Sequence, residues 1–125
     1  LKNLDSVPIW GTGNVKREFL YVTDMAEASI HIMNLSKSIF NKCTTHMCSH
    51  INIGSGYDLT IKELAINIAK VIDYKGKLTF DISKPDGTPR KLLDSSVLRS
   101  LGWSPKVSLL DGLESTYEDF KKIKL

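Results

Sequence analysis

The apolar positions of the chain follow two periods, a period of two that is typical of strands and a period between three and four that is typical of helices. Four runs rich in β-branched and aromatic residues predict strands, at residues 7–11, 17–22, 50–54 and 77–82. In the last run, Leu78, Phe80 and Ile82 alternate with polar residues and are expected to face a covered side. The polar segment 38–49 is expected to be a loop.

Helical spacing predicts two long helices. Residues 60–73 carry one apolar face, and Thr60 with Glu63 matches the capping box that begins a helix. Residues 23–37 are apolar on more than one side, and Asp24, with an acidic residue three positions later, is expected to mark the start of that helix.

Two further helices are predicted toward the C-terminus. Asp94 is expected to cap a short helix that Gly102 ends, and Ser108 with Asp111 is expected to begin the last helix. Strands therefore alternate with helices, which predicts an α/β or α+β-like fold with a small mixed sheet and about four helices. The length of 125 residues suits a single region spanning 1–125.

Composition narrows the class of protein. The hydrophobic content of 42% and the charged content of 25% are those of a globular domain and argue against disorder. The net charge of +3 is too small to predict a nucleic-acid partner, and the chain has no apolar run of the roughly 20 residues that a membrane helix needs. Because the chain begins at Leu1 rather than Met, we expect it to be a piece of a longer protein.

Two cysteines and two histidines lie close together in the segment CTTHMCSH. Cys43, His46, Cys48 and His50 are too closely spaced to wrap one zinc ion easily, because zinc sites separate their ligand pairs by a turn or a helix. No metal site is therefore predicted, and the two cysteines are expected to be reduced thiols in a cytosolic loop.

The glycine and tyrosine patterns do not predict catalysis by this chain alone. The turns GTG at 11–13 and GSG at 54–56 each follow a predicted strand, but neither continues into G-x-G-x-x-G, so both are expected to be tight turns rather than cofactor sites. The only Tyr-x-x-x-Lys match, Tyr117 with Lys121, lies in the last predicted helix. We therefore predict no catalytic and no cofactor-binding residue here.

Cations and fixed backbone point instead to the binding of an anion. The segment SKPDGTPRKLLD holds two prolines and ends its polar part in two cations, and Arg17 follows the first turn. Arg17, with Lys16 beside it, and the pair Arg90 and Lys91 lie on separate loops and could converge on a diphosphate. Trp10 could stack on a base, and Asp86 could accept hydrogen bonds from ribose hydroxyls. The alternative is that Arg17 is a surface charge paired with a neighbour and that Trp10 belongs to the core.

Three stretches of the sequence, two long and one short, carry a resemblance to a known family. They are WGTGNVKREFLYVTDMAEASIHIM, SHINIGSGYDLTIKELAINIAKVIDYKGKLTFDISKPDGTPRKLLD and LGWSP. Together they make the chain resemble the C-terminal part of the GDP-L-fucose synthase family of extended short-chain dehydrogenases/reductases. KPDGTPRKLLD is the most specific string, whereas the W-G-x-G and N-x-G-x-G frames are shared by many nucleotide-sugar epimerases and dehydratases.

The resemblance implies a role for four residues. Trp10, Arg17, Asp86 and Lys91 match substrate-binding positions, with Arg17 on the diphosphate of a GDP-sugar. The implied parent enzyme is cytoplasmic and homodimeric, and it epimerises and reduces GDP-4-keto-6-deoxy-D-mannose to GDP-L-fucose with NADPH. Its NADPH-binding Rossmann domain would precede this chain and would be its partner, so the chain alone is expected to be inactive and to expose apolar surface along residues 24–37 and 50–54.

Two alternatives remain open from the sequence. One is the corresponding region of another nucleotide-sugar epimerase or dehydratase. The other is a non-catalytic basic interaction module, which would bind RNA with a steep dependence on salt.

Overall fold

The computed structural model describes residues 4–123 and divides the chain into two compact units. Unit 1 contains the described parts of Leu1–Arg17, Asp58–Lys91 and Leu110–Leu125, and unit 2 contains Glu18–Tyr57 and Leu92–Leu109. Each unit is therefore assembled from segments that are far apart in the sequence.

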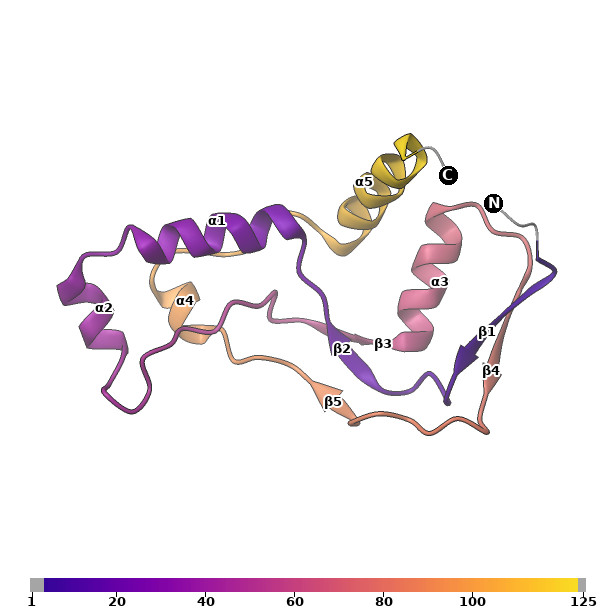
Figure 1. Cartoon of the computed structure of the whole chain (residues 1–125), viewed down its shortest axis with the longest axis horizontal. Coiled ribbons are helices and arrows are strands. Elements are labelled where there is room, and N and C mark those ends of the chain that lie inside the picture. Colours follow the sequence, from indigo (N-terminus) through magenta and orange to yellow (C-terminus); the bar gives the residue numbers. More distant parts are fainter. Residues whose placement is uncertain (1–3, 124–125) are drawn as a thin grey trace. The chain divides into compact units, whose positions relative to one another are not determined.

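Helices and strands alternate along much of the chain (Figure 1). Within residues 4–123 the elements are β1 (Ser6–Trp10), β2 (Lys16–Glu18), α1 (Val22–Met33), α2 (Lys37–Cys43), β3 (Asp58–Thr60), α3 (Ile61–Val71), β4 (Lys77–Asp81), β5 (Arg90–Lys91), α4 (Ser96–Ser100) and α5 (Leu109–Lys122). The predicted α/β class is confirmed, with one helix more than the four predicted.

The strands are short, and the pairs β1–β4 and β2–β5 are parallel. β1 pairs with β4 from Ser6↔Lys77 to Trp10↔Asp81, and β2 pairs with β5 in a second set whose strand order is β3-β2-β5. Figure 1 shows β1 and β4 side by side. Because parallel strands end at the same edge, the segments that follow β1 and β4 emerge together.

Helix α3 begins as predicted. The Thr60 hydroxyl accepts a hydrogen bond from the Glu63 amide at 3.1 Å, and the Glu63 carboxylate accepts one from the Thr60 amide at 2.8 Å, which completes the capping box. In β4, Leu78 and Phe80 are half-buried as expected. Ile82 is 79% exposed, so its predicted inward position is wrong, because the strand ends at Asp81.

Unit 2 is organised around a small core. Ala28 of α1, Leu98 of α4 and Trp103 are buried, and four half-buried apolar residues pack against them, Leu20, Ile32, Ile51 and Ile53. The predicted strand at 50–54 is wrong, since this segment is in no strand ladder of the described chain. Its alternating isoleucines reach the core, and its polar residue Asn52 donates to the Asp94 carbonyl at 3.1 Å.

The start of α1 differs from the prediction. The helix begins at Val22, with Tyr21 as its N-cap and no side-chain cap. Asp24 lies within the first turn, is 1% exposed, and accepts hydrogen bonds from the amides of Lys106 and Val107, each at 3.0 Å. Its carboxylate therefore anchors a distant segment of unit 2 instead of capping its own helix.

The ends of other elements also differ from the predicted ones. The predicted strand at 17–22 is shorter, because β2 ends at Glu18, and the helix predicted to reach residue 37 ends at Met33. Part of the expected loop at 38–49 is α2, whose N-cap Ser36 accepts from the Ile39 amide at 3.3 Å. The end of α4 is as predicted, with Gly102 at φ +88° in the left-handed conformation that favours glycine.

No helix in the described part of the chain is long and apolar enough to cross a membrane.

Removing the Asp24 carboxylate is expected to loosen unit 2 locally. Asp24→Ala leaves the amides of Lys106 and Val107 without their acceptor, and an unpaired buried donor costs about 1–3 kcal/mol. Hydrogen exchange measured by NMR should show the protection of these two amides fall by roughly 10- to 100-fold. The Lys62 amide, which donates to Gly13 in unit 1, is the internal control. Unchanged protection at residues 106 and 107 would contradict this role.

The contribution of Asp58 to the stability of unit 1 should be lost at acid pH. Asp58 is only 8% exposed at its side chain, and the ion pair with Arg90 holds the pKa of its carboxyl below the ordinary value. A lowered folded pKa adds stability above the unfolded pKa of about 3.9, and this stability is lost as the pH falls through the folded pKa. Urea unfolding of wild type and Asp58→Asn should therefore give a stability difference that is constant above about pH 5 and shrinks below about pH 4. A difference as large at pH 3 as at pH 7 would contradict the assignment.

Candidate functional site

Two loops meet at the edge where β1 and β4 end. The Asp86 carboxylate accepts hydrogen bonds from both the amide and the hydroxyl of Thr12, at 2.9 and 2.7 Å. These bonds hold the pKa of the Asp86 carboxyl below its ordinary value. Asp86 therefore ties the turn after β1 to the proline-containing loop between β4 and β5. The sequence indicated neither this bond nor the part that Thr12 plays in it.

Arg17 is held against the same loop. Its Nη1 donates to the carbonyls of Lys16 and Thr88, at 2.6 and 2.7 Å, and Nη2 lies 3.0 Å from where a side chain on Gly87 would begin. A guanidinium has five N–H donors, so those on Nη2 and Nε remain for a ligand. Within residues 4–123 Arg17 forms no ion pair, which makes the surface-pair alternative wrong in this part of the chain.

The register of β2 and β5 separates four cations into two pairs. Arg17 is the partner of Lys91, and Lys16 is the partner of Arg90. Register partners lie on the same face of a sheet, and neighbours along a strand lie on opposite faces. Arg17 and Lys91, both predicted to bind substrate, therefore lie side by side on one face. Arg90, on the other face, forms an ion pair with Asp58.

Trp10, the last residue of β1, is 74% exposed, so the alternative that it belongs to the core is wrong. The ammonium of Lys84, from the loop after β4, lies over the indole at 5.7 Å from the ring centroid. Unit 1 thus presents an exposed aromatic ring, an Arg–Lys pair and a loop fixed by Asp86. The ligand contacts expected of Trp10, Arg17, Asp86 and Lys91 themselves stay predictions.

The glycine turns are closely packed by side chains. A Cβ on Gly11 would meet the Asp86 carboxylate at 2.2 Å, and one on Gly13 would meet the Phe80 ring at 2.4 Å. Both glycines have positive φ, as a tight turn requires. The second motif is similar, because a Cβ on Gly56 would meet the Arg99 guanidinium at 2.2 Å. Close packing at these three positions therefore requires glycine.

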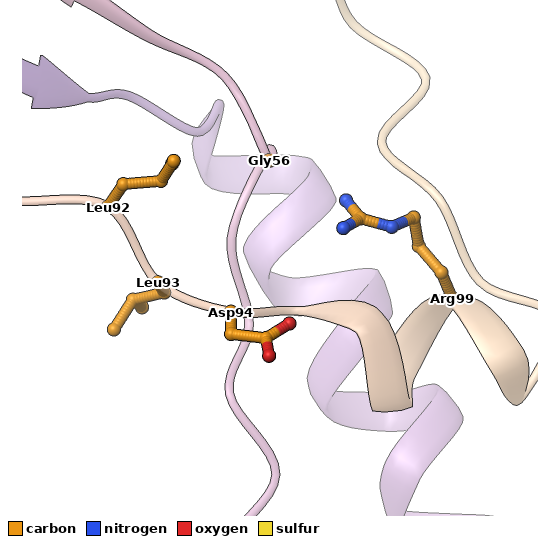
Figure 2. A pocket seen from close by; sticks show the side chains of 5 residues that line it. All are labelled: Gly56, Leu92, Leu93, Asp94 and Arg99. Atoms are coloured by element: carbon orange, nitrogen blue, oxygen red, sulfur yellow. The ribbon is translucent and has the colours of Figure 1, made fainter.

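A separate pocket of about 280 Å³ lies in unit 2. Figure 2 shows Arg99 extending from α4 beside Gly56, with the other lining residues, Leu92, Leu93 and Asp94, on the segment before that helix. Glu18 fixes these segments, accepting from the amides of Gly56 and Leu93 at 2.7 and 3.1 Å. None of the four predicted substrate-binding residues lines this pocket.

The Cys and His segment does not form a metal site among the described residues. The Cys48 thiol lies 4.0 Å from Nδ1 of His50, and a short turn joins Thr45 to Cys48. Both cysteines are free in the structure. Cys43 is the last residue of α2 and not part of the predicted loop.

Comparisons with known proteins identify the relatives of this chain. The model of the NAD dependent epimerase/dehydratase family matches residues 1–54. A GDP-L-fucose synthase of Escherichia coli is 56% identical over 119 residues, which are 95% of this chain and 37% of that protein. The chain spans about a third of the length of the curated relatives it matches.

Two solved structures from Campylobacter jejuni share the fold. A GDP-6-OMe-4-keto-L-xylo-heptose reductase superposes with a TM-score of 0.87 at 40% identity, covering 96% of this chain and 35% of that one. A GDP-D-glycero-L-gluco-heptose synthase, solved in the presence of NADPH, gives a TM-score of 0.83 at 39% identity, covering 94% and 33%. The chain is therefore similar over residues 1–54 to the NAD dependent epimerase/dehydratase family, and over nearly its whole length to a part of relatives named GDP-L-fucose synthase.

Proposed function

We propose that this chain is the nucleotide-sugar-binding, C-terminal region of a GDP-L-fucose synthase, the enzyme that epimerises and reduces GDP-4-keto-6-deoxy-D-mannose to GDP-L-fucose. The observation that carries the proposal is the pairing of Arg17 with Lys91 in one register of β2 and β5, beside the exposed ring of Trp10. The names of its relatives support the same substrate class.

The proposed binding mode uses this chain's own groups. The donors on Nη2 and Nε of Arg17 form two bonds to the diphosphate, and the ammonium of Lys91 adds a second charge on the same face. A ring of the ligand stacks on Trp10. Asp86 holds the loop in place through Thr12 and offers its outer lone pairs to a sugar hydroxyl.

Cofactor and chemistry belong, in this proposal, to a Rossmann domain outside this chain. NADPH bound there supplies the hydride for reduction, and the residues described here orient the substrate toward it. We further propose that the parent enzyme is a cytoplasmic homodimer. The apolar face of α1 would rest on the Rossmann domain, since Val22, Ile30 and Met33 are 70%, 58% and 82% exposed.

A second candidate is a related reductase acting on another GDP-sugar, favoured by the 40% identity to the heptose reductase. The sugar distinguishes the two, because both relatives carry GDP in their names. The RNA-binding alternative is weakened by the division of the cations between two faces and by the Asp58–Arg90 pair. Calorimetry with GDP, UDP and a short RNA separates the two GDP-sugar candidates from the RNA-binding alternative, and the proposal requires preference for GDP.

Loss of Arg17 should weaken binding of the diphosphate. A bidentate charge-assisted contact is worth about 1.5–3 kcal/mol, so Arg17→Ala should raise the Kd for GDP-sugar by roughly 10- to 100-fold. Arg17→Lys should recover only part of the affinity, because an ammonium keeps the charge and loses the planar fork.

The matched control is Lys75→Ala, which removes an exposed cation of unit 1 that is paired with Asp73. Calorimetry should give wild-type affinity for this control. Since Arg17 also holds the Thr88 carbonyl, circular dichroism and thermal unfolding must show that the Arg17 variants remain folded. Unchanged GDP affinity in folded Arg17→Ala would remove Arg17 from the site.

The exposed face of α1 should make the isolated chain self-associate or bind hydrophobic dyes. Met33→Lys, which adds charge to the most exposed apolar residue of α1, should reduce light scattering and dye fluorescence without loss of helix. Ser115→Lys, at an exposed polar residue of α5, is the control for added charge. A strictly monomeric wild-type chain that binds no dye would contradict the docking role.

A further inference from the structure

The loop between β4 and β5 holds one more cation, Lys84, and hydrogen bonds within the loop fix the position of its backbone. The side chain of Asp81 accepts hydrogen bonds from the amide and hydroxyl of Ser83, at 3.1 and 2.6 Å. The backbone carbonyl of Asp81 accepts a hydrogen bond from the Lys84 amide at 3.2 Å. These bonds form a turn directly after β4. Pro85 follows and restricts the backbone of Lys84 to extended conformations.

This turn directs Lys84 onto Trp10. Asp81 is the register partner of Trp10, so a turn beginning at Asp81 returns beside the end of β1. The Lys84 ammonium lies over the indole at 5.7 Å, and within residues 4–123 it makes no hydrogen bond or ion pair. A cation over an exposed ring is held only weakly, so it can be exchanged at low cost.

A stacked ligand ring would need the space that the ammonium fills. The centroids of stacked aromatic rings are about 4.5–7 Å apart. The Lys84 ammonium, at 5.7 Å from the centroid of the indole, therefore occupies the position that a stacked ring would take. The same loop continues to Gly87, which lies beside Nη2 of Arg17, and to Thr88, whose carbonyl Arg17 binds. An ammonium displaced from the indole therefore remains on the loop that contacts the diphosphate-binding guanidinium.

We propose that Lys84 is a third diphosphate-binding cation of this site, which rests on Trp10 and transfers to the phosphates when the base or sugar of a nucleoside diphosphate stacks on the indole. The inference rests on the proposed function of the Arg17–Lys91 face. Stacking and phosphate binding are then coupled, because the ring of the ligand displaces the Lys84 ammonium from the indole and the phosphates of the same ligand bind it.

The first test is the placement itself, and it requires no ligand. The sequence has two tryptophans, and Trp103 is 7% exposed, so quenching reports mainly on Trp10. Iodide is attracted by a nearby ammonium, whereas acrylamide is neutral. Lys84→Gln should therefore lower quenching by iodide and leave quenching by acrylamide unchanged, and Lys75→Gln should change neither. Equal iodide quenching in wild type and Lys84→Gln would overturn the placement.

The second test separates phosphate from base. Calorimetry with GDP should show Lys84→Gln weakened by about 3- to 10-fold, below the value for a buried pair because the site is exposed. Binding of guanosine should be unchanged or slightly tighter, since the ring face is freed. Lys84→Arg should restore GDP affinity, and Lys75→Gln should match wild type.

The outcomes distinguish this inference from the proposed function. If wild type binds GDP and Arg17→Ala does not, but Lys84→Gln equals wild type, then Lys84 has no phosphate contact and the inference is overturned alone. Equal weakening of GDP and guanosine would also overturn it, because Lys84 would then act through the base. If wild type binds no nucleoside diphosphate, the proposed function and this inference fall together.

Discussion

The candidate site depends on the pair of hydrogen bonds between Asp86 and Thr12. These bonds close two loops against each other at the end of β1 and β4. Fixing one residue of backbone costs about 1–2 kcal/mol, and a loop of this length would lose that entropy on binding a ligand if it were free. Pro85 and Pro89 further restrict the chain on either side of the bonds. The ordering cost is therefore met during folding, which leaves more of the contact energy for binding.

Arg17 extends this arrangement, because it is part of the frame and part of the surface offered to a ligand. Its Nη1 holds the carbonyls of Lys16 and Thr88, so the guanidinium is already oriented. The remaining donors on Nη2 and Nε form the planar fork that suits phosphate oxygens. A lysine at this position would have neither the second hydrogen-bonding edge nor the fixed direction.

Sequence reasoning predicted the elements governed by local patterns and missed those governed by distant partners. The capping box of α3 and the glycine that ends α4 depend on neighbours in the chain, and both were predicted. The strand expected at 50–54 failed because a strand needs a hydrogen-bonded neighbour, which an apolar alternation does not supply. β5 went unnoticed for the opposite reason, since two charged residues are a strand only through pairing with β2. Asp24 likewise showed the pattern of a cap, but its carboxylate binds amides more than 80 positions away.

The same dependence on pairing explains why the site residues could be named from the sequence but not arranged. Placing Arg17 beside Lys91, and Lys16 beside Arg90, sets like charges directly opposite each other, which destabilises a strand pair. On one face the carboxylate of Asp58 relieves this repulsion. On the other face, neither Arg17 nor Lys91 has an ion pair within residues 4–123. A bound anion would relieve the repulsion there, so the electrostatic asymmetry of one short strand pair supports the proposal of a phosphate site on the Arg17–Lys91 face rather than on the Lys16–Arg90 face.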